Sequence, residues 1–178
     1  MDIFKSEDIK KAINSNASNS ICGFLYQFQR ALFRIFSSSS SNMLVGIETL
    51  DDVSTLTRSE NGELALDLEQ NKYTGKENYN PFGDKDRNLW HTLNIWLSNL
   101  KTYRNSYVDV NFFLTTNAII PLDSLVLKIS NADSSEKINE IISIIRTISG
   151  TTKNKEIKEV SKYDDESLFF VIKKTTVF

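Results

Sequence analysis

The dipeptide Asn61-Gly62 constrains the fold of this chain more than any other feature, because it separates two stretches that resemble β-strands. Residues 43–56 are rich in apolar and β-branched side chains, and residues 64–73 begin with leucine at every second position. Asn-Gly between such stretches is a strong signal for a tight turn, so the sequence predicts a β-hairpin. The register of this hairpin then decides which side chains of the two strands face one another.

Helical and strand patterns surround the hairpin on both sides. Apolar residues three and four positions apart predict helices, and short apolar runs of period two predict strands. The third helix is predicted to start at Asp133, which forms a capping-box-like pair with Glu136. The resulting order predicts an α/β fold with a central mixed β-sheet flanked by helices. The predicted elements are helices over 20–36, 86–103 and 133–148 and strands over 108–115 and 168–173, with a lysine-rich loop (Lys153, Lys155, Lys158) before the last strand.

The first predicted helix carries its apolar residues as one stripe, which we expect to be buried. Gln27, Arg30 and Arg34 lie off the centre of that stripe. Cys22 is expected to be a small buried residue. The stripe consists of Ile21, Phe24, Leu25, Phe28, Leu32, Ile35 and Phe36. On the second helix, Trp90 and Trp96 lie at helical spacing and are expected to pack in the core.

Length and composition indicate one cytoplasmic domain and narrow the choice of metal. The 178 residues suit a single hydrophobic core, and the one cysteine allows no internal disulfide. With one histidine, His91, the chain lacks a Cys/His zinc site, so any metal would be a hard ion held by carboxylates, such as Mg²⁺ or Mn²⁺. The N-terminus is too polar for a signal peptide, and no apolar run approaches the roughly 18 residues of a membrane span. The net charge of −2 provides no overall attraction for nucleic acid.

Polar side chains of the predicted hairpin form the candidate site. Glu48, Asp51 and Asp52 precede the turn, and Gln70 and Lys72 follow it on one face of the return strand. A two-residue turn would place Asp51 opposite Lys72, whereas a bulge or a longer loop would place Asp52 there. The second register is favoured, because Glu48 then joins Asp52 on one face while the valine and isoleucine side chains of the first strand stay on the other, buried face.

Acids, an amide and a lysine in this arrangement suit the hydrolysis of a phosphodiester. Carboxylates can hold a divalent ion that activates water and neutralises developing charge, and a lysine can stabilise the pentacovalent state. A glutamine can replace a second acid by offering its carbonyl oxygen to the metal. Glu69 points to the opposite face of the strand from Lys72, so a Glu-x-x-Lys motif does not form. The plain alternative is a solvated hairpin surface with Lys–Asp cross-strand pairs.

Five short motifs carry a family resemblance when they are taken in order. They are residues 23–27 (GFLYQ), 47–53 (IETLDDV), 70–72 (QNK), 89–96 (LWHTLNIW) and 113–116 (FLTT). Together they resemble the effector nuclease domain of bacterial anti-phage systems, which occurs in the double-stranded DNA endonucleases of CBASS systems and in the Lamassu effector subunit. That domain belongs to the PD-(D/E)xK superfamily. His91 departs from the pattern, because a basic residue is expected there; we interpret it as a helix-surface residue.

The resemblance implies a PD-(D/E)xK, restriction-endonuclease-like core and a role for each residue of the hairpin. Asp52 and Gln70 would ligate Mg²⁺, for which Mn²⁺ could substitute, and Asp51 would be a further ligand or support the metal. Lys72 would be the catalytic lysine. Glu48 would assist catalysis beside the metal.

The resemblance also implies a biological setting. Residues 1–178 would be one nuclease domain, the N-terminal part of a longer effector that is activated by oligomerisation. Its partners would be double-stranded DNA and either further copies or other subunits of a defence complex. Gln27 would contact the site from the first helix or be an exposed polar residue. RNA as substrate stays open, as do two other functions: a catalytically inactive binding module of the same fold, and an interaction protein whose hairpin is plain surface.

Overall fold

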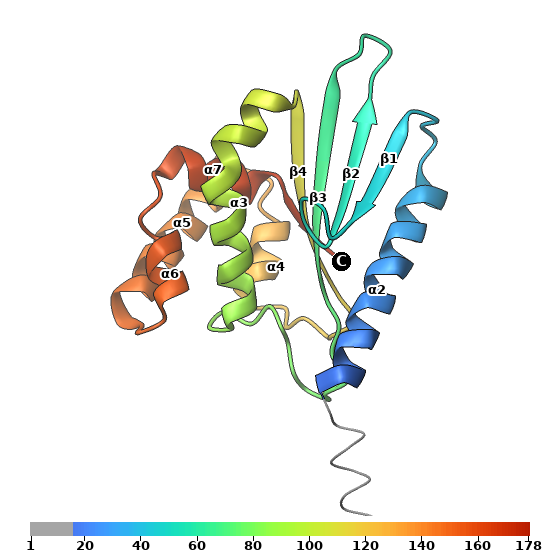
Figure 1. Cartoon of the computed structure of the whole chain (residues 1–178). Helices are drawn as coiled ribbons and strands as arrows, with labels where there is room; N and C mark the ends of the chain where they lie inside the picture. The colour runs from blue at the N-terminus through green and yellow to red at the C-terminus, as the bar shows by residue number, and fades with distance from the viewer. Residues whose placement is uncertain (1–15) are drawn as a thin grey trace, which may run out of the picture.

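A computed structural model describes residues 16–178, in which five strands form one mixed sheet (Figure 1). β1, β2 and β3 pair antiparallel, whereas β4 lies parallel to β3 and β5 lies parallel to β4. A parallel neighbour requires a crossover connection, and the segment between β3 and β4 supplies it through a helix. This arrangement confirms the predicted mixed central sheet. The strands are β1 (Met43–Ile47), β2 (Val53–Arg58), β3 (Leu64–Lys72), β4 (Asp109–Thr116) and β5 (Thr175–Val177), in that order across the sheet.

Helices flank the sheet on both faces, as the α/β prediction requires (Figure 1). On one face, α2 (Asn16–Ser37) packs against β1, β2 and β3. On the other face, α3 (Arg87–Ser106) and α4 (Leu125–Ser130) contact the strands, and α5 (Ser135–Thr151), α6 (Lys155–Val160) and α7 (Asp165–Lys173) pack against those helices. The main hydrophobic core lies on this second face. Within residues 16–178, none of the helices has the length and apolar character to cross a membrane.

The predicted hairpin is present as β2 and β3, but its loop is longer than two residues. A hydrogen bond from Ser59 N to Glu63 O (2.9 Å) extends the pairing and leaves residues 60–62 as the loop. Gly62 has a φ of +84°, in the left-handed region that glycine enters without steric cost. A type I turn that ends in such a glycine is the common three-residue hairpin loop.

The register of this hairpin differs from both registers that the sequence analysis considered. Val53 is paired with Glu69, and continuing the same register by one step brings Asp52 opposite Gln70. The prediction that Asp51 or Asp52 lies directly across from Lys72 is therefore wrong. The physical reason is that the loop takes its extra residue, Glu60, from the β2 side of the turn, whereas the favoured register needs the extra residue on the β3 side.

The first half of the predicted hairpin was expected to be one strand over residues 43–56, and this is also wrong. The chain reverses direction over residues 48–52, so that β1 folds back on β2 and Ile47 pairs with Val53. A hydrogen bond from Glu48 N to Asp52 O (3.0 Å) closes this turn, and Glu48 has a φ of +52°. Gly46 permits the close approach, because a Cβ atom there would lie 2.5 Å from the hydroxyl oxygen of Thr49.

The second predicted helix and the strand after it are confirmed. α3 begins after Asp86, whose side chain accepts a hydrogen bond from Asn88 N (2.8 Å) and caps the helix. Trp90 and Trp96 are buried on the face that meets the sheet, as their spacing predicts. β4 begins one residue later than predicted and ends one residue later.

The C-terminal third differs from the prediction in two elements. Residues 168–173, predicted as a strand, belong to helix α7, because Asp164 caps its start by accepting a hydrogen bond from Ser167 N (2.7 Å). The buried side chains of α7 then recur three and four residues apart, which is helical spacing. The expected lysine-rich loop is in large part helix α6, with Asn154 as its cap. The buried residues of α7 are Leu168, Val171 and Ile172.

Two smaller differences concern helices α4 and α5. The sequence did not predict α4, a six-residue helix capped by Ser124. The third predicted helix is α5, but its cap is Ser134, which accepts a hydrogen bond from Lys137 N (3.3 Å), and not Asp133. Asp133 instead forms an exposed ion pair with Lys137 (2.8 Å).

The helix predicted over residues 20–36 is present within α2, but the expected burial of its apolar residues is wrong. The seven residues of the apolar stripe are between 47% and 81% exposed. α2 turns its polar side toward the sheet instead, with Gln27 and Ala31 buried and Arg30 and Arg34 in contact with β3. The reason lies in β3, whose α2-facing positions carry Asp67, Glu69 and Asn71 and therefore require polar partners. Cys22, also expected to be buried, is partly exposed on this helix.

Candidate active site

The turn between β1 and β2 gathers the three acids that the sequence singled out. Because the chain reverses over residues 48–52, Glu48, Asp51 and Asp52 lie in a loop at the end of the sheet and not along one strand. β3 passes beside this loop with Gln70 and Lys72 close to its carboxyl end. The five residues therefore meet at one end of the sheet, although the predicted strand geometry was different.

Asp52 is joined to β3 by two hydrogen bonds to the same carboxylate oxygen. Its Oδ2 accepts from the side-chain amide of Gln70 and from the backbone N of Asn71 (2.8 Å). Gln70 is 7% exposed, and its Oε1 accepts a hydrogen bond from the hydroxyl of Thr92 on α3 (3.0 Å). The amide of Gln70 is thus held from the turn on one side and from a core helix on the other.

Asp51 points in a different direction, toward α3. Its Oδ2 accepts a hydrogen bond from the indole Nε1 of Trp96 (2.7 Å), and its Oδ1 accepts from the backbone N of Asp52 (2.9 Å). Burial raises the pKa of Asp51 to about 6, although the bond from Trp96 opposes the shift. A carboxyl group in this state changes charge just below neutral pH.

Lys72 provides the positive charge of the cluster. Burial also raises the pKa of Asp52, and the Lys72 ammonium is the strongest of the influences that lower it again. The same ammonium lowers the pKa of Asp51 more weakly, and the carboxylate of Glu48 raises that of Asp52. These interactions place Lys72 within electrostatic reach of both aspartates and Glu48 within reach of Asp52.

Gln27 joins the cluster from the opposite face of the sheet. Its Nε2 donates a hydrogen bond to Glu48 Oε1 (2.7 Å), and its side chain is 8% exposed. Of the two alternatives that the sequence left open, an exposed polar residue is therefore wrong, because Gln27 is buried against Glu48. The Oε1 atom of Gln27 is buried and has no hydrogen-bond partner among the described residues.

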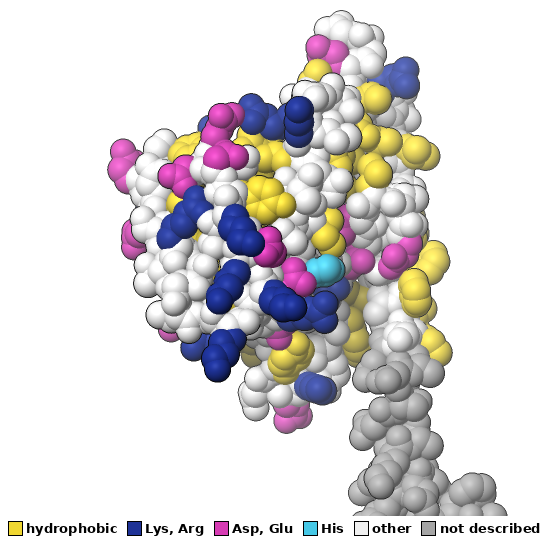
Figure 2. All heavy atoms as spheres, turned by 60° about the vertical axis from the view of Figure 1, so that its left-hand side comes forward, with side chains coloured by type: hydrophobic (Ala, Val, Ile, Leu, Met, Phe, Trp, Pro, Cys, Tyr) yellow, Lys and Arg dark blue, Asp and Glu magenta, His cyan; other side chains and the backbone are white. Residues whose placement is uncertain are grey.

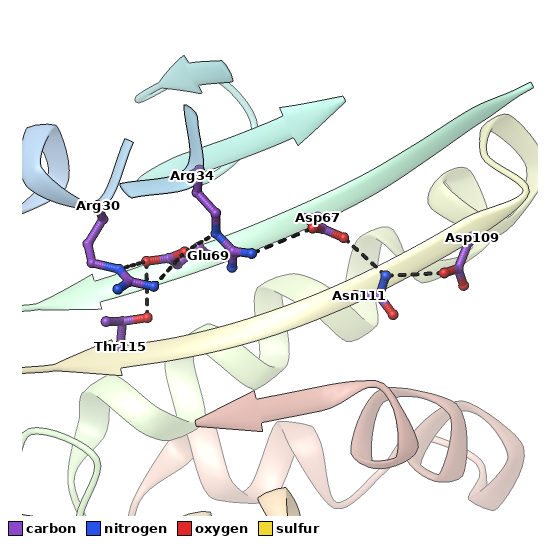
Figure 3. A network of polar contacts seen from close by, with 7 residues as sticks. All are labelled: Arg30, Arg34, Asp67, Glu69, Asp109, Asn111 and Thr115. Atoms are coloured by element: carbon purple, nitrogen blue, oxygen red, sulfur yellow. Dashed lines mark hydrogen bonds and ion pairs between the residues drawn. The ribbon is translucent and has the colours of Figure 1, made fainter. Parts of the chain in front are cut away.

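A polar network under α2 joins this helix to the sheet (Figure 3). Glu69 is 1% exposed and binds Arg30 Nε (2.5 Å) and Arg34 Nε (2.7 Å), while Thr115 on β4 donates a further hydrogen bond (3.0 Å). In Figure 3 both arginines extend from α2 onto β3, and the network continues along the two strands. Its further members are Asp67, which Arg34 approaches at 3.7 Å, and Asn111, which donates to Asp67 (3.0 Å) and to Asp109 (3.2 Å).

Sequence reasoning missed two residues that orient the site, Thr92 and Trp96. Trp96 was correctly predicted to pack in the core, but its indole N–H also donates to an acid 45 positions earlier. Thr92 and Trp96 are four residues apart, and so they share the face of α3 that meets β3. That spacing beside a buried glutamine is the signal that could have found them. His91 lies on the other side of the helix, 51% exposed and 3.4 Å from Glu156, and is a helix-surface residue as predicted.

A groove lies between the loops that follow β3 and β4, and its lining begins two residues after Lys72. It has a volume of about 600 Å³ and is lined by residues 74–80, 117–119 and 121. Two hydrogen bonds join its walls, from Thr74 N to Asn117 Oδ1 and from Asn117 Nδ2 to Thr74 O, both 2.8 Å. Lys76 and Glu77 supply one positive and one negative charge to its lining. On the helical face of the molecule, basic and acidic side chains are also intermingled (Figure 2).

The donors in the cluster suit a hard divalent cation better than any other metal. Among the described residues, no group of three or more His, Cys, Asp or Glu side chains is arranged to hold a metal. A site here would therefore combine the carboxylates of Asp51 and Asp52 with the amide oxygen of Gln70. Turning the Gln70 amide over would direct Oε1 toward Asp52 and Nε2 toward the Thr92 hydroxyl, which can accept as well as donate. The raised pKa values of both aspartates fit, because a cation would compensate two poorly solvated anions.

Comparison of the chain with protein families, with curated proteins and with solved structures finds no match.

Proposed function

We propose that this protein is a metal-dependent endonuclease that hydrolyses double-stranded DNA, with Asp51, Asp52, Gln70 and Lys72 as the centre of its active site. The observation that carries the proposal is the contact between Asp52 and Gln70, two residues before Lys72 on the same face of β3. A PD-(D/E)xK core with glutamine in place of the second acid requires this juxtaposition. The mixed sheet flanked by helices is compatible with such a core.

Each residue has a task that follows from its contacts. Asp52 and Gln70 would hold Mg²⁺ or Mn²⁺, with Asp51 as a further ligand oriented by Trp96. The bound ion would supply an activated water and neutralise charge on the phosphate. The Lys72 ammonium, already within electrostatic reach of both aspartates, would stabilise the negative charge that develops on the phosphate oxygens.

Glu48 and Gln27 are positioning residues in this scheme. The hydrogen bond between them ties the acidic turn to α2, and the ion pairs of Glu69 tie α2 to the sheet. The groove between the loops that follow β3 and β4 lies at the carboxyl ends of these parallel strands, where a substrate could approach Lys72. The resemblance to anti-phage effectors adds the proposal that cleavage serves defence and is switched on by assembly.

The test is cleavage of a supercoiled plasmid in the presence of Mg²⁺ or Mn²⁺, with the chain fused to an inducible oligomeriser. Wild type should nick and linearise the plasmid, EDTA should stop the reaction, and Lys72→Ala should lower the rate on the order of 100-fold or more. Lys101→Ala is the matched control, because Lys101 is an exposed lysine on α3. Single-stranded RNA and duplex RNA of equal length, assayed in parallel, establish the preference for DNA.

A second measurement separates catalysis from binding. Mn²⁺ should raise the melting temperature of wild type, and Asp52→Asn should abolish that rise while leaving the circular dichroism spectrum unchanged. If DNA is bound without cleavage and Mn²⁺ has no effect, the protein is a binding module of the same fold. If Lys72→Ala changes neither cleavage nor binding, the proposed site is wrong.

A further inference from the structure

The exposed stripe of α2 has the spacing of a helix-pairing seam. Ile21, Leu25, Phe28, Leu32 and Ile35 follow one another at intervals of four, three, four and three residues. This is the alternation of the a and d positions of a coiled coil, in which apolar side chains insert between those of a partner helix. All five are among the exposed large apolar side chains of the protein. Phe24 and Phe36 extend the stripe on either side.

The charges of α2 lie on the side opposite to the seam. Arg30 and Arg34 are the two charged residues between Asn16 and Ser37, and both bind Glu69 on the sheet. The outward face is therefore apolar and uncharged. This face has no positive charge that could bind the phosphates of nucleic acid. It also lacks the Lys and Arg residues with which a surface helix binds anionic lipid. An uncharged apolar seam suits another apolar helix.

The size of the stripe matches what a stable protein interface needs. Seven large side chains, each 47% to 81% exposed, present on the order of 700 Å² of apolar surface, and a standard interface buries about 800 Å² on each partner. A shallow groove of about 480 Å³ runs along the same side of the helix, between Leu25, Phe28 and Leu32 and the ring of Tyr73. It provides holes into which side chains of a partner helix can insert.

We propose that the occupant of this surface is a second copy of the same chain, whose α2 pairs with the first along the seam. A 4-3-4-3 seam is complementary to itself, and two-fold symmetric pairing of identical surfaces is the commonest form of protein assembly. No like charges meet in such a pair, because both arginines of each α2 face their own sheet. Gln27 and the acidic turn also lie on the sheet side, so the pairing leaves the candidate active site uncovered. The inference rests on α2 alone and does not depend on the proposed chemistry.

Sedimentation velocity of the whole chain tests the proposal over roughly 1–100 µM, the range in which interfaces of this size commonly associate. Wild type should sediment with twice the 20.3 kDa mass of the chain. The double substitution Leu25→Asp and Leu32→Asp should weaken the dimer on the order of 100-fold or more, because each change is made twice in a symmetric interface. Leu122→Asp is the matched control: Leu122 is 90% exposed and borders a groove lined by residues of α4 and α5, and the dimer of this variant should be unchanged.

A cross-linking experiment covers the case in which the aspartate variants fail to fold. Phe28 lies at the centre of the seam, so Phe28→Cys in a Cys22→Ser background should form an intermolecular disulfide under mild oxidation, whereas Leu122→Cys in the same background should not. A monomer at every concentration without cross-linking at position 28 would overturn the proposal. A dimer that survives both aspartates, or that cross-links equally well at position 122, would overturn the assignment of the surface.

Discussion

Replacing Glu69 with glutamine is the most direct test of how α2 is held. The Glu69 carboxylate is 1% exposed and accepts from Arg30 Nε (2.5 Å), Arg34 Nε (2.7 Å) and Thr115 Oγ1 (3.0 Å). Glu69→Gln keeps the shape of the side chain but removes its charge. One of its two terminal atoms also becomes a donor that faces the N–H group of an arginine. Two guanidinium groups then lose their compensating charge.

The expected loss follows from the burial of these groups. Removing one partner of a buried ion pair typically costs about 3–5 kcal/mol, because the other charge stays desolvated without compensation. The side chains of Arg30 and Arg34 are 14% and 15% exposed, so some water reaches them, and Arg34 keeps Asp67 at 3.7 Å. Both facts place the expected loss near the lower end, at about 3 kcal/mol of unfolding free energy.

Urea denaturation followed by circular dichroism measures this loss. The matched control is Glu166→Gln, which also removes one carboxylate from an arginine pair (2.9 Å to Arg104), but at a position 78% exposed. Exposed pairs contribute little, so the control should change stability by no more than about 0.5 kcal/mol. A loss of less than about 1 kcal/mol for Glu69→Gln would refute the argument that this buried charge pair anchors α2.

Three further predictions concern the turn, the site and the hairpin loop. Burial raises the pKa of Asp51 to about 6, so ionisation of this carboxyl penalises the folded state. The contribution of the protonated Asp51 to the free energy of unfolding is therefore complete below about pH 4 and is lost as the pH rises through about 6. The ¹³C resonance of the Asp51 carboxyl should titrate with a midpoint at about 6, and a midpoint near the ordinary value of about 3.9 would show that the group is solvated. Trp96→Phe removes the hydrogen bond to the ionised form and should move that midpoint upward, with a downward movement as the contrary result. Gly62→Ala, at a φ of +84°, should cost about 1 kcal/mol in urea denaturation, whereas Gly75→Ala should be close to neutral, and equal effects would contradict the left-handed turn.

Much of the fold follows from local patterns in the sequence. Helix α3, strand β4 and the β2–β3 hairpin were all predicted, because each has a strong period of its own and clear ends: Asp86 as a cap, and Asn61-Gly62 as a turn. The alternation along β3 was also predicted correctly. Gln70 contacts Thr92 on the core side, and Glu69 contacts α2 on the other. Successive side chains of a strand point to opposite faces of the sheet, so the face of each residue can be predicted without knowing which elements pack against it.

Errors occurred where the same residue types are compatible with two different conformations. The apolar run of α7 is short enough to form either a strand or a buried helix. The N-cap at Asp164 favours the helix. The turn at residues 48–52 contains no glycine or proline, which are the usual sequence signals of a turn, so β1 and β2 were predicted as one strand. It is closed by the hydrogen bond from Glu48 N to Asp52 O, which the sequence pattern does not reveal.

The sequence by itself determined which residue types this protein can use: three acids, a glutamine and a lysine flanking one hairpin, and a helix with one apolar and one polar side. Tertiary structure alone decided how they meet. The loop takes its extra residue from the β2 side, so that Asp52 contacts Gln70, and the reversal at residues 48–52 directed Asp51 toward Trp96. The orientation of α2 was decided in the same way. A periodic pattern shows that a helix has an apolar side, but the side that meets the sheet depends on what the sheet presents, and β3 presents Glu69 to the arginines.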